Sequence, residues 1–252
     1  MSQKILTEKS GPVTTIIINR PEVRNALDRE ATAALGAAIR AFEEDDEARV
    51  AVLCGAGGAF CAGADLKELA GGAEYDAWAG SDGPLSRPAR KPIIAAVAGH
   101  ACAGGLGLAL WCDIRIAEDS ASFAVLSRRW GVPMSDGTTV RLPRLIGTSL
   151  ALDMLLTARM VSAAEALQMG LASRVVPDGS VRSAAEALAA TMAAFPQIAM
   201  NSDRESVYRQ DGASMGDALE IEAELAERAK RIEAKAGASR FASGMGRHGA
   251  VA

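Results

Sequence analysis

Two segments of this chain share one order of features: an apolar run typical of a buried strand, a loop of small residues, and a predicted helix. The first segment has its strand at 50–54 and its loop and helix start at 59–68. The second has its strand at 92–97 and its loop and helix start at 99–107. A helix N-terminus leaves backbone N–H groups unpaired, at the positive end of the helix dipole. If the two loops lie together, they offer two backbone donors to one oxygen that becomes negative during a reaction.

Strands dominate the early part of the predicted element order and helices the last part. The β-branched run Val13–Ile18 predicts a strand, and Asp28 is a suitable N-cap for the helix that follows it. Further along the chain, the patterns predict short strands at 113–117, 122–126 and 174–176 and helices near 180–195, 198–209 and 214–235. This order predicts an α/β core over residues 1–197 and a helical region over residues 198–252.

The composition suits one large hydrophobic core and argues against several classes of function. Of the 252 residues, 49% are apolar and only 4% aromatic, so the core is built mainly from Ala, Val, Leu and Ile. The formal net charge of −4 argues against a general affinity for nucleic acids or anionic membranes. An anionic ligand would therefore need a few local cations rather than a basic surface.

The cysteines and histidines do not indicate a metal site or a disulfide framework. The four cysteines (Cys54, Cys61, Cys102 and Cys112) form no Cys-x-x-Cys pair, and the chain has only two histidines. The sequence starts without a signal-peptide stretch and has no run of about 18 apolar residues. We therefore expect a reduced, cytoplasmic protein without a bound metal or a membrane span.

Four parts of the chain, in this order and spacing, resemble the crotonase (enoyl-CoA hydratase/isomerase) superfamily. They are Asn19–Leu27 (Asn-Arg-Pro-Glu-Val-Arg-Asn-Ala-Leu), Phe60–Leu66, Gly99–Asp113, and Gly147–Thr157 followed by Ser162–Val176. The resemblance implies a spiral of ββα units, an active site between the two loops, and an acyl-CoA thioester as substrate. It also implies a homotrimer or hexamer, with residues 198–252 in the subunit contacts and over the CoA. No cofactor is implied beyond the CoA of the substrate.

The resemblance also implies roles for individual residues. The two N–H groups that bind the thioester carbonyl would be those of Ala64 and Gly104, and removing one such donor typically costs about 3–4 kcal/mol. The residues expected against the CoA moiety are Arg24, Ala26, Ala62, Asp65, Leu66 and Phe241. The lysine expected three residues after Phe241 is Gly244 here, so Arg247 or His248 would have to replace it.

The chain departs from the superfamily at both positions where hydratases carry a catalytic glutamate. These positions are Gly107 and Ser127 in this sequence. Adding water to an enoyl double bond needs a base for the water and an acid for the α-carbon. Glycine can be neither, and serine needs an adjacent base. The sequence therefore favours isomerisation or other enolate chemistry over hydration by two glutamates.

Asp136 is the nearest remaining carboxylate and has two possible roles. Some isomerases of the superfamily carry an aspartate in this loop, one position earlier, where this chain has Ser135. The alternative is that Asp136 caps the helix predicted from about Gly137. The neighbouring Arg128-Arg129 pair either enters the pocket or is solvated, and His100 is expected as a structural or pocket-wall residue. Residues 71–86, residues 127–136 and the C-terminal helices are expected to shape the acyl pocket.

Other classes of protein fit the sequence less well. A dinucleotide-binding loop at 55–60 would need glycine where the chain has Phe60, and no Gly-x-Ser-x-Gly elbow of a serine hydrolase occurs. Two alternatives remain open within the resemblance. One is an acyl-CoA-binding or scaffold protein that has lost its catalytic acids, and the other is a true enoyl-CoA hydratase that uses other acids.

Overall fold

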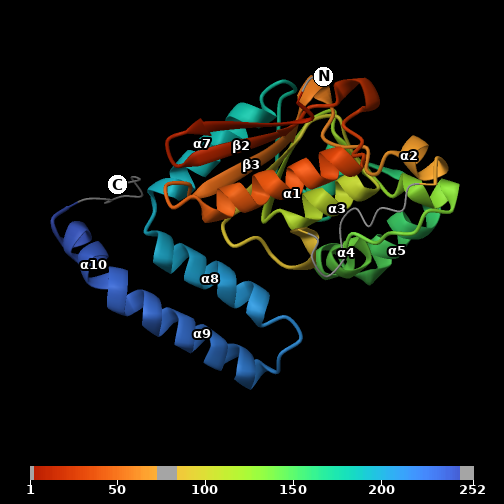
Figure 1. Ribbon diagram of the computed structural model, residues 1–252. Coiled ribbons are helices and arrows are strands. Elements are labelled where there is room, and N and C mark those ends of the chain that lie inside the picture. Colours follow the sequence, from red (N-terminus) through yellow and green to blue (C-terminus); the bar gives the residue numbers. More distant parts are fainter. Residues whose placement is uncertain (1–2, 73–83, 245–252) are drawn as a thin grey trace. The chain divides into compact units, whose positions relative to one another are not determined.

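The structure is a computed structural model, which describes residues 3–72 and 84–244. Strands and helices alternate through most of the chain, and helices alone make up its last part (Figure 1). This agrees with the predicted α/β core and helical C-terminal region. Within the described ranges, no helix combines the length and the apolar composition needed to cross a membrane.

The chain divides into two compact units, residues 1–189 and 190–252. The division lies inside helix α7 (Val181–Ala194). The sequence predicts the boundary between residues 197 and 198, one residue after the start of helix α8 (Gln197–Arg209).

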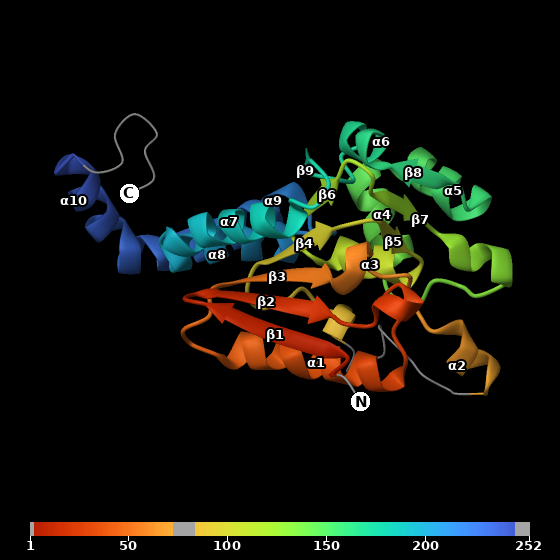
Figure 2. The same cartoon turned by 90° about the horizontal axis from the view of Figure 1, so that it is seen from above.

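The first unit is built on a six-stranded sheet, whose strands are labelled from β1 to β9 in Figure 2. Its order is β1 (Ile5–Ser10), β2 (Val13–Ile18), β3 (Val50–Gly55), β4 (Ile93–Val97), β6 (Ile114–Glu118) and β9 (Arg174–Val176). β1 and β2 are antiparallel, with Ile5 opposite Ile18, and the other neighbours are parallel. β2, β3 and β4 are almost wholly buried, as expected of central strands covered on both faces.

A second sheet has three strands, and its first strand is the element that follows β4 in the chain. Its order is β5 (His100–Cys102), β7 (Ser122–Ala124) and β8 (Met160–Ser162). β5 and β7 are parallel, and β7 and β8 are antiparallel. An isolated bridge between Cys61 and Ala101 joins the loop after β3 to β5.

Helices pack around these sheets. They are α1 (Arg29–Glu44), α2 (Leu66–Ala70), α3 (Gly104–Trp111), α4 (Thr138–Ile146), α5 (Thr148–Thr157) and α6 (Ala163–Gln168), with short 3-10 turns at Pro21–Val23, Ala56–Gly58, Pro84–Ser86 and Leu126–Trp130. Asp28 caps α1 as predicted, because its carboxylate accepts a hydrogen bond from the Ala31 N–H at 2.8 Å. All eight residues of α3 are buried, so the helix that follows the second loop has a fixed place in the core.

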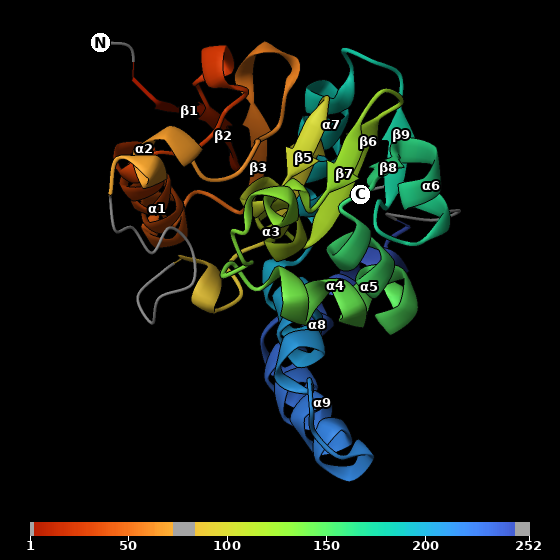
Figure 3. The same cartoon turned by 90° about the vertical axis from the view of Figure 1, so that its right-hand side faces the viewer.

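The second unit contains α8, α9 (Met215–Ala229), a π-helical segment (Lys230–Ala234) and α10 (Lys235–Ala242), with α8 and α9 drawn in blue in Figure 3. The Glu233 carboxylate accepts the N–H groups of Ile198 and Ala199 at 3.1 and 2.8 Å. It therefore satisfies donors in the first turn of α8 and ties the π-helical segment to that helix.

Candidate active site

The two small-residue loops identified in the sequence lie in direct contact. The Cys61 N–H donates to the His100 carbonyl oxygen, and the Cys102 N–H donates to the Cys61 carbonyl oxygen, each at 3.0 Å. A Cβ on Gly105 would lie 2.0 Å from that Cys61 oxygen. A Cβ on Gly63 would lie 2.8 Å from the Gly104 nitrogen. Glycine at these two positions therefore permits the close approach of the loops.

Two backbone N–H groups beside this contact, those of Ala64 and Gly104, belong to residues of one cavity. The Leu27 N–H donates to the Gly63 carbonyl oxygen at 2.8 Å, and the Leu27 carbonyl oxygen accepts the Asp65 N–H at 2.9 Å. The N–H of Ala64, between Gly63 and Asp65, takes no part in the pairing. Gly104 is the first residue of α3, so its N–H has no acceptor within the helix. Among the described residues, neither N–H donates a hydrogen bond to another protein atom, and both residues line the cavity.

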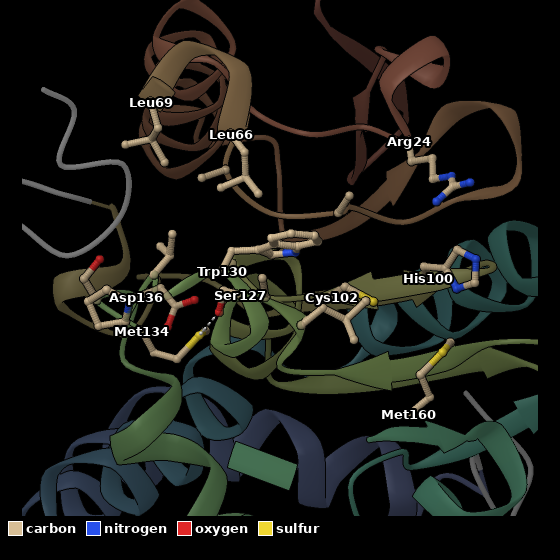
Figure 4. Close-up of a pocket in the computed structure, with 18 residues that line it drawn as sticks. Arg24, Leu66, Leu69, His100, Cys102, Ser127, Trp130, Met134, Asp136 and Met160 are labelled. Atoms are coloured by element: carbon tan, nitrogen blue, oxygen red, sulfur yellow. Dashed lines mark hydrogen bonds between the residues drawn. The ribbon is translucent and has the colours of Figure 1, made fainter. Parts of the chain in front are cut away.

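The cavity has a volume of about 570 Å³ and a mostly apolar wall. Its apolar side chains include Leu66, Leu69, Leu126, Trp130, Val132 and Met134. Arg24 and His100 lie at one end of it, and Asp136 lies at the other end (Figure 4). Of the described residues that line the cavity, Asp136 is the only carboxylic acid. The size and the few polar groups are typical of a site for a small organic ligand.

Asp136 accepts a hydrogen bond at the start of α4 and also lines the cavity, although the N-cap position of α4 is held by Gly137. Its Oδ1 accepts the N–H of Thr138, the first residue of α4, at 2.9 Å. The residue is only 1% exposed. Burial raises the pKa of Asp136, while the hydrogen bond from Thr138 and the charge of Arg141 oppose that rise. The two roles left open by the sequence are therefore compatible in one side chain.

The Asp136 carboxylate lies directly against Gly107. A Cβ on Gly107 would be 2.2 Å from Asp136 Oδ2 and 2.3 Å from its Cγ. The carboxyl group thus takes the space in which a side chain at position 107 would begin. The other departure from the hydratase pattern, Ser127, is buried and donates its hydroxyl to the Met134 sulfur at 3.2 Å.

The N-terminal motif is organised by Asn25, which the sequence analysis did not single out. Asn25 is fully buried, and its side-chain amide donates to the carbonyl oxygens of Ala56 and Ala59 at 2.8 and 2.6 Å. Arg24 and Asn25 both have positive φ, at 53° and 58°. Asparagine adopts positive φ more readily than most residues, so its presence at position 25 is a sequence signal for this turn. The Arg24 carbonyl oxygen accepts the Ala62 N–H at 3.0 Å, so the motif is fixed to the first loop.

The residues expected against CoA do not all reach the cavity. Arg24, Ala62 and Leu66 line it, whereas Ala26 and Asp65 do not. Asp65 caps α2 by accepting the Lys67 N–H at 3.1 Å and pairs with Arg20 at 3.2 Å. The Arg20 guanidinium also donates to the Ala26 carbonyl oxygen. In this structure Asp65 and Ala26 therefore hold the first loop in place, and their contacts with CoA stay predictions.

The structure also shows where the remaining candidate side chains lie relative to the cavity. His100 is a wall residue of the cavity, with Nδ1 2.7 Å from Ser122 Oγ. Arg128 and Arg129 do not line the cavity; Arg129 donates to the Ala158 carbonyl oxygen at 2.9 Å. The hypothesis that this pair enters the pocket is not supported. Cys102 lines the cavity, but burial raises the pKa of its thiol to about 11, so it is a poor nucleophile at neutral pH.

Some predicted features fall outside this cavity or outside the described residues. Phe241 is 64% exposed in α10 of the second unit, and its contact with adenine stays a prediction. Arg247, His248 and most of the 71–86 loop lie outside the described residues. In the ranges that the structure describes, no group of three or more His, Cys, Asp or Glu side chains is arranged to hold a metal ion.

Comparison with known sequences gives one consistent result. A family model described as enoyl-CoA hydratase/isomerase matches residues 8–244. The chain is 37% identical over 228 residues to the enoyl-CoA hydratase EchA19 of Mycobacterium tuberculosis, covering 87% of this chain and 86% of that protein. It is 36% identical over 214 residues to a carnitinyl-CoA dehydratase of Salmonella enteritidis, covering 83% of this chain and 81% of that protein.

Comparison with solved structures agrees. An enoyl-CoA hydratase of M. tuberculosis matches with a TM-score of 0.90 and 32% identity, covering 95% of this chain and 96% of that one. An enoyl-CoA hydratase subunit of Geobacillus kaustophilus matches with a TM-score of 0.86 and 33% identity, covering 96% and 95%. The predicted fold class is confirmed by these matches.

Proposed function

Because this chain belongs to the enoyl-CoA hydratase/isomerase family, we propose that its cavity binds an acyl-CoA thioester and that Asp136 moves a proton on the acyl group. One observation carries the proposal. The only carboxylic acid among the described wall residues lies in the same cavity as the unpaired N–H groups of Ala64 and Gly104. A proton acceptor and two oxyanion donors are what enolate formation requires.

The oxyanion donors make the proton at the α-carbon removable. The thioester carbonyl oxygen accepts hydrogen bonds from the Ala64 and Gly104 N–H groups, at the N-terminus of α3. When the α-proton leaves, its electron pair moves toward this oxygen, and the negative charge develops where the donors already point. The donors and the helix dipole therefore stabilise the enolate more than the neutral thioester.

A single carboxylate is enough to move a double bond. With a 3-enoyl thioester, Asp136 takes the α-proton and the electrons spread over a dienolate. The protonated Asp136 then returns a proton to the γ-carbon, and the 2-enoyl thioester forms without any net change in atoms. Hydration would need a second acid–base group, and among the described wall residues no second carboxylic acid is present. We therefore favour isomerisation.

The wall of the cavity indicates the orientation and class of the ligand. The apolar side chains near Asp136 suit a hydrocarbon acyl group, whose burial is worth about 0.8 kcal/mol per CH₂. Arg24, at the opposite end, offers the cation that an anionic CoA needs. The names of the relatives, enoyl-CoA hydratase and carnitinyl-CoA dehydratase, keep hydration or dehydration as the second candidate function.

The proposal is tested with Asp136→Asn, which preserves the shape of the side chain and removes the base. Deuterium incorporation at the acyl α-carbon in D₂O should fall by roughly 10²–10⁴-fold, because a positioned base contributes that much. Affinity for the acyl-CoA should stay unchanged, and Asp119→Asn, an exposed aspartate, should behave as the wild type. Binding without exchange in the wild type, over a panel of acyl-CoAs, would favour a non-catalytic binding protein. Rapid hydration of crotonyl-CoA by the wild type would contradict the isomerase assignment.

A further inference from the structure

We propose that Gly107 is a positioning residue, because the space left by its missing side chain holds the Asp136 carboxylate in the cavity. The packing part of this proposal stands on geometry alone. Its catalytic consequence rests on the function proposed above. It also explains why the chain lacks one of the two hydratase glutamates: a side chain at position 107 and the carboxyl group of Asp136 exclude each other.

The α3 side of the contact cannot yield. A Cβ on Gly107 would meet three atoms of one group, with Asp136 Oδ2 at 2.2 Å, Cγ at 2.3 Å and Oδ1 at 2.9 Å. Real Cβ atoms essentially never approach other heavy atoms within 3.0 Å. The residues on both sides, Leu106 and Leu108, are fully buried, so α3 cannot move away without disturbing the core.

The Asp136 side of the contact is also fixed. Its Oδ1 accepts the Thr138 N–H at 2.9 Å. The Arg141 guanidinium donates to the Asp136 carbonyl oxygen at 3.0 Å and to the Leu85 carbonyl oxygen at 2.6 Å. Gly137, at φ +83°, leaves room for this guanidinium, because a Cβ there would lie 2.1 Å from Arg141 Nη1. The start of α4 therefore holds the carboxylate against α3.

The consequence is that the cavity accepts a carboxylate from one of two elements, but not from both. In this chain the loop before α4 supplies it, and α3 contributes an empty space. Adding even one carbon at position 107 must push the carboxylate away from its present place. Misplacing a catalytic group by about 1 Å can cost roughly 10²-fold in rate.

The packing claim is tested by a double-mutant cycle of Gly107→Ala and Asp136→Ala, followed by thermal unfolding. In the wild type, Gly107→Ala should lower Tm by roughly 3–10 °C, because overpacking outweighs the gain in helix propensity. With Asp136→Ala present, the same change should leave Tm unchanged or raise it. Gly36→Ala in α1 is the matched control, since a Cβ there meets only the end of the Arg40 side chain, at 3.4 Å. Equal effects of Gly107→Ala in both backgrounds would overturn the proposal.

The positioning claim is tested by α-carbon deuterium exchange. Gly107→Ala should reduce the exchange rate by about 10²-fold at unchanged acyl-CoA affinity, whereas Gly36→Ala should not. The low-pH limb of the exchange rate should also move to lower pH, since a displaced carboxylate is better solvated. An unchanged exchange rate and pH profile in Gly107→Ala would overturn the positioning role.

The same experiments separate this proposal from the proposed function. If the stability cycle shows coupling but Asp136→Asn retains full exchange, the proposed function fails and the exclusion between positions 107 and 136 stands. A Gly107→Glu variant gives a second, larger probe. It should be less stable with Asp136 present than with Asp136→Ala, and the reverse order would overturn the proposal.

Discussion

At the scale of single residues, the chemistry proposed for the cavity depends on how one buried carboxylate is held. Asp136 is stabilised in its ionised form by the Thr138 N–H and destabilised by burial, and burial prevails. A raised pKa makes a carboxylate a stronger base than an exposed aspartate once it is ionised. The same burial that places Asp136 against Gly107 therefore also suits it to accept a proton.

The pH dependence of activity should report this raised pKa. Because the ionised form is the base, the exchange rate should fall as the pH falls through the pKa of Asp136, at a higher pH than an ordinary aspartate would give. The measurement is the rate of α-carbon deuterium exchange against pH in the wild type. A low-pH limb at the usual value for an exposed aspartate would contradict the prediction.

The stability of the fold should change in the same pH window, with a definite sign. A pKa that is higher in the folded than in the unfolded state gives stability that is present at low pH and is lost as the pH rises through the folded value. Asp136→Asn cannot ionise, so its unfolding free energy should rise relative to the wild type over that window. Denaturant unfolding of both proteins across the window provides the comparison.

At the scale of elements, the site is a product of two loops and the helix start that follows the second. The hydrogen bonds of Cys61 with His100 and with Cys102 bring the loops together, and Gly104 is the first residue of α3. In the proposed function, backbone atoms rather than side chains supply the oxyanion donors. Side-chain replacement therefore tests them poorly, whereas removal of the N–H tests them directly.

Gly104→Pro should remove one donor without breaking α3, because proline is tolerated in the first turn of a helix. The exchange rate should fall by roughly 10²–10³-fold, the usual effect of losing one oxyanion donor. Gly104→Ala keeps the N–H and is the control for the added carbon. Circular dichroism establishes that each variant is folded. A folded Gly104→Pro protein with wild-type exchange would remove Gly104 from the oxyanion site.

Much of this element-scale arrangement follows from the sequence, because small residues after a buried strand are a local signal. The strands at 50–55 and 93–97 and the helix from Gly104 agree with the patterns. β1 is not predicted, since only Ile5 is buried in it and its remaining residues show no apolar alternation. β5 and β8 are also not predicted, since β5 lies within the small-residue loop at 99–107 and only Val161 is buried in β8.

The relation between Asp136 and Gly107 could not be predicted in the same way. Their sequence separation is large, and their contact depends on turns at Gly131 and Gly137, both at positive φ. The sequence indicates that Gly107 departs from the hydratase pattern and that Asp136 is the nearest remaining carboxylate. Only the three-dimensional structure shows that the Asp136 carboxyl group takes the space left by the missing side chain at position 107. The role of Asn25 could not be predicted either, because it depends on burial and on the carbonyl oxygens of Ala56 and Ala59, which are distant in sequence.

At the scale of the whole molecule, the surface of the single chain has many exposed apolar side chains. In the second unit these include Val207, Met215, Leu219, Ile232 and Phe241, which are 56–77% exposed. Exposed apolar groups in such number are typical of surfaces that bind another protein. The resemblance in the sequence implies another copy of this chain as that partner.

We expect the 26.0 kDa chain to form a homotrimer or a hexamer, with α9 in the subunit contacts. Light scattering at micromolar concentration should therefore give three or six times the mass of one chain. Leu219→Lys should shift the mass toward that of a single chain, because it places a charge in an apolar contact. Glu220→Lys puts the same side chain on the adjacent exposed position and should leave the assembly intact. A wild-type protein with the mass of one chain would contradict the prediction, since its exposed leucines would then need another partner.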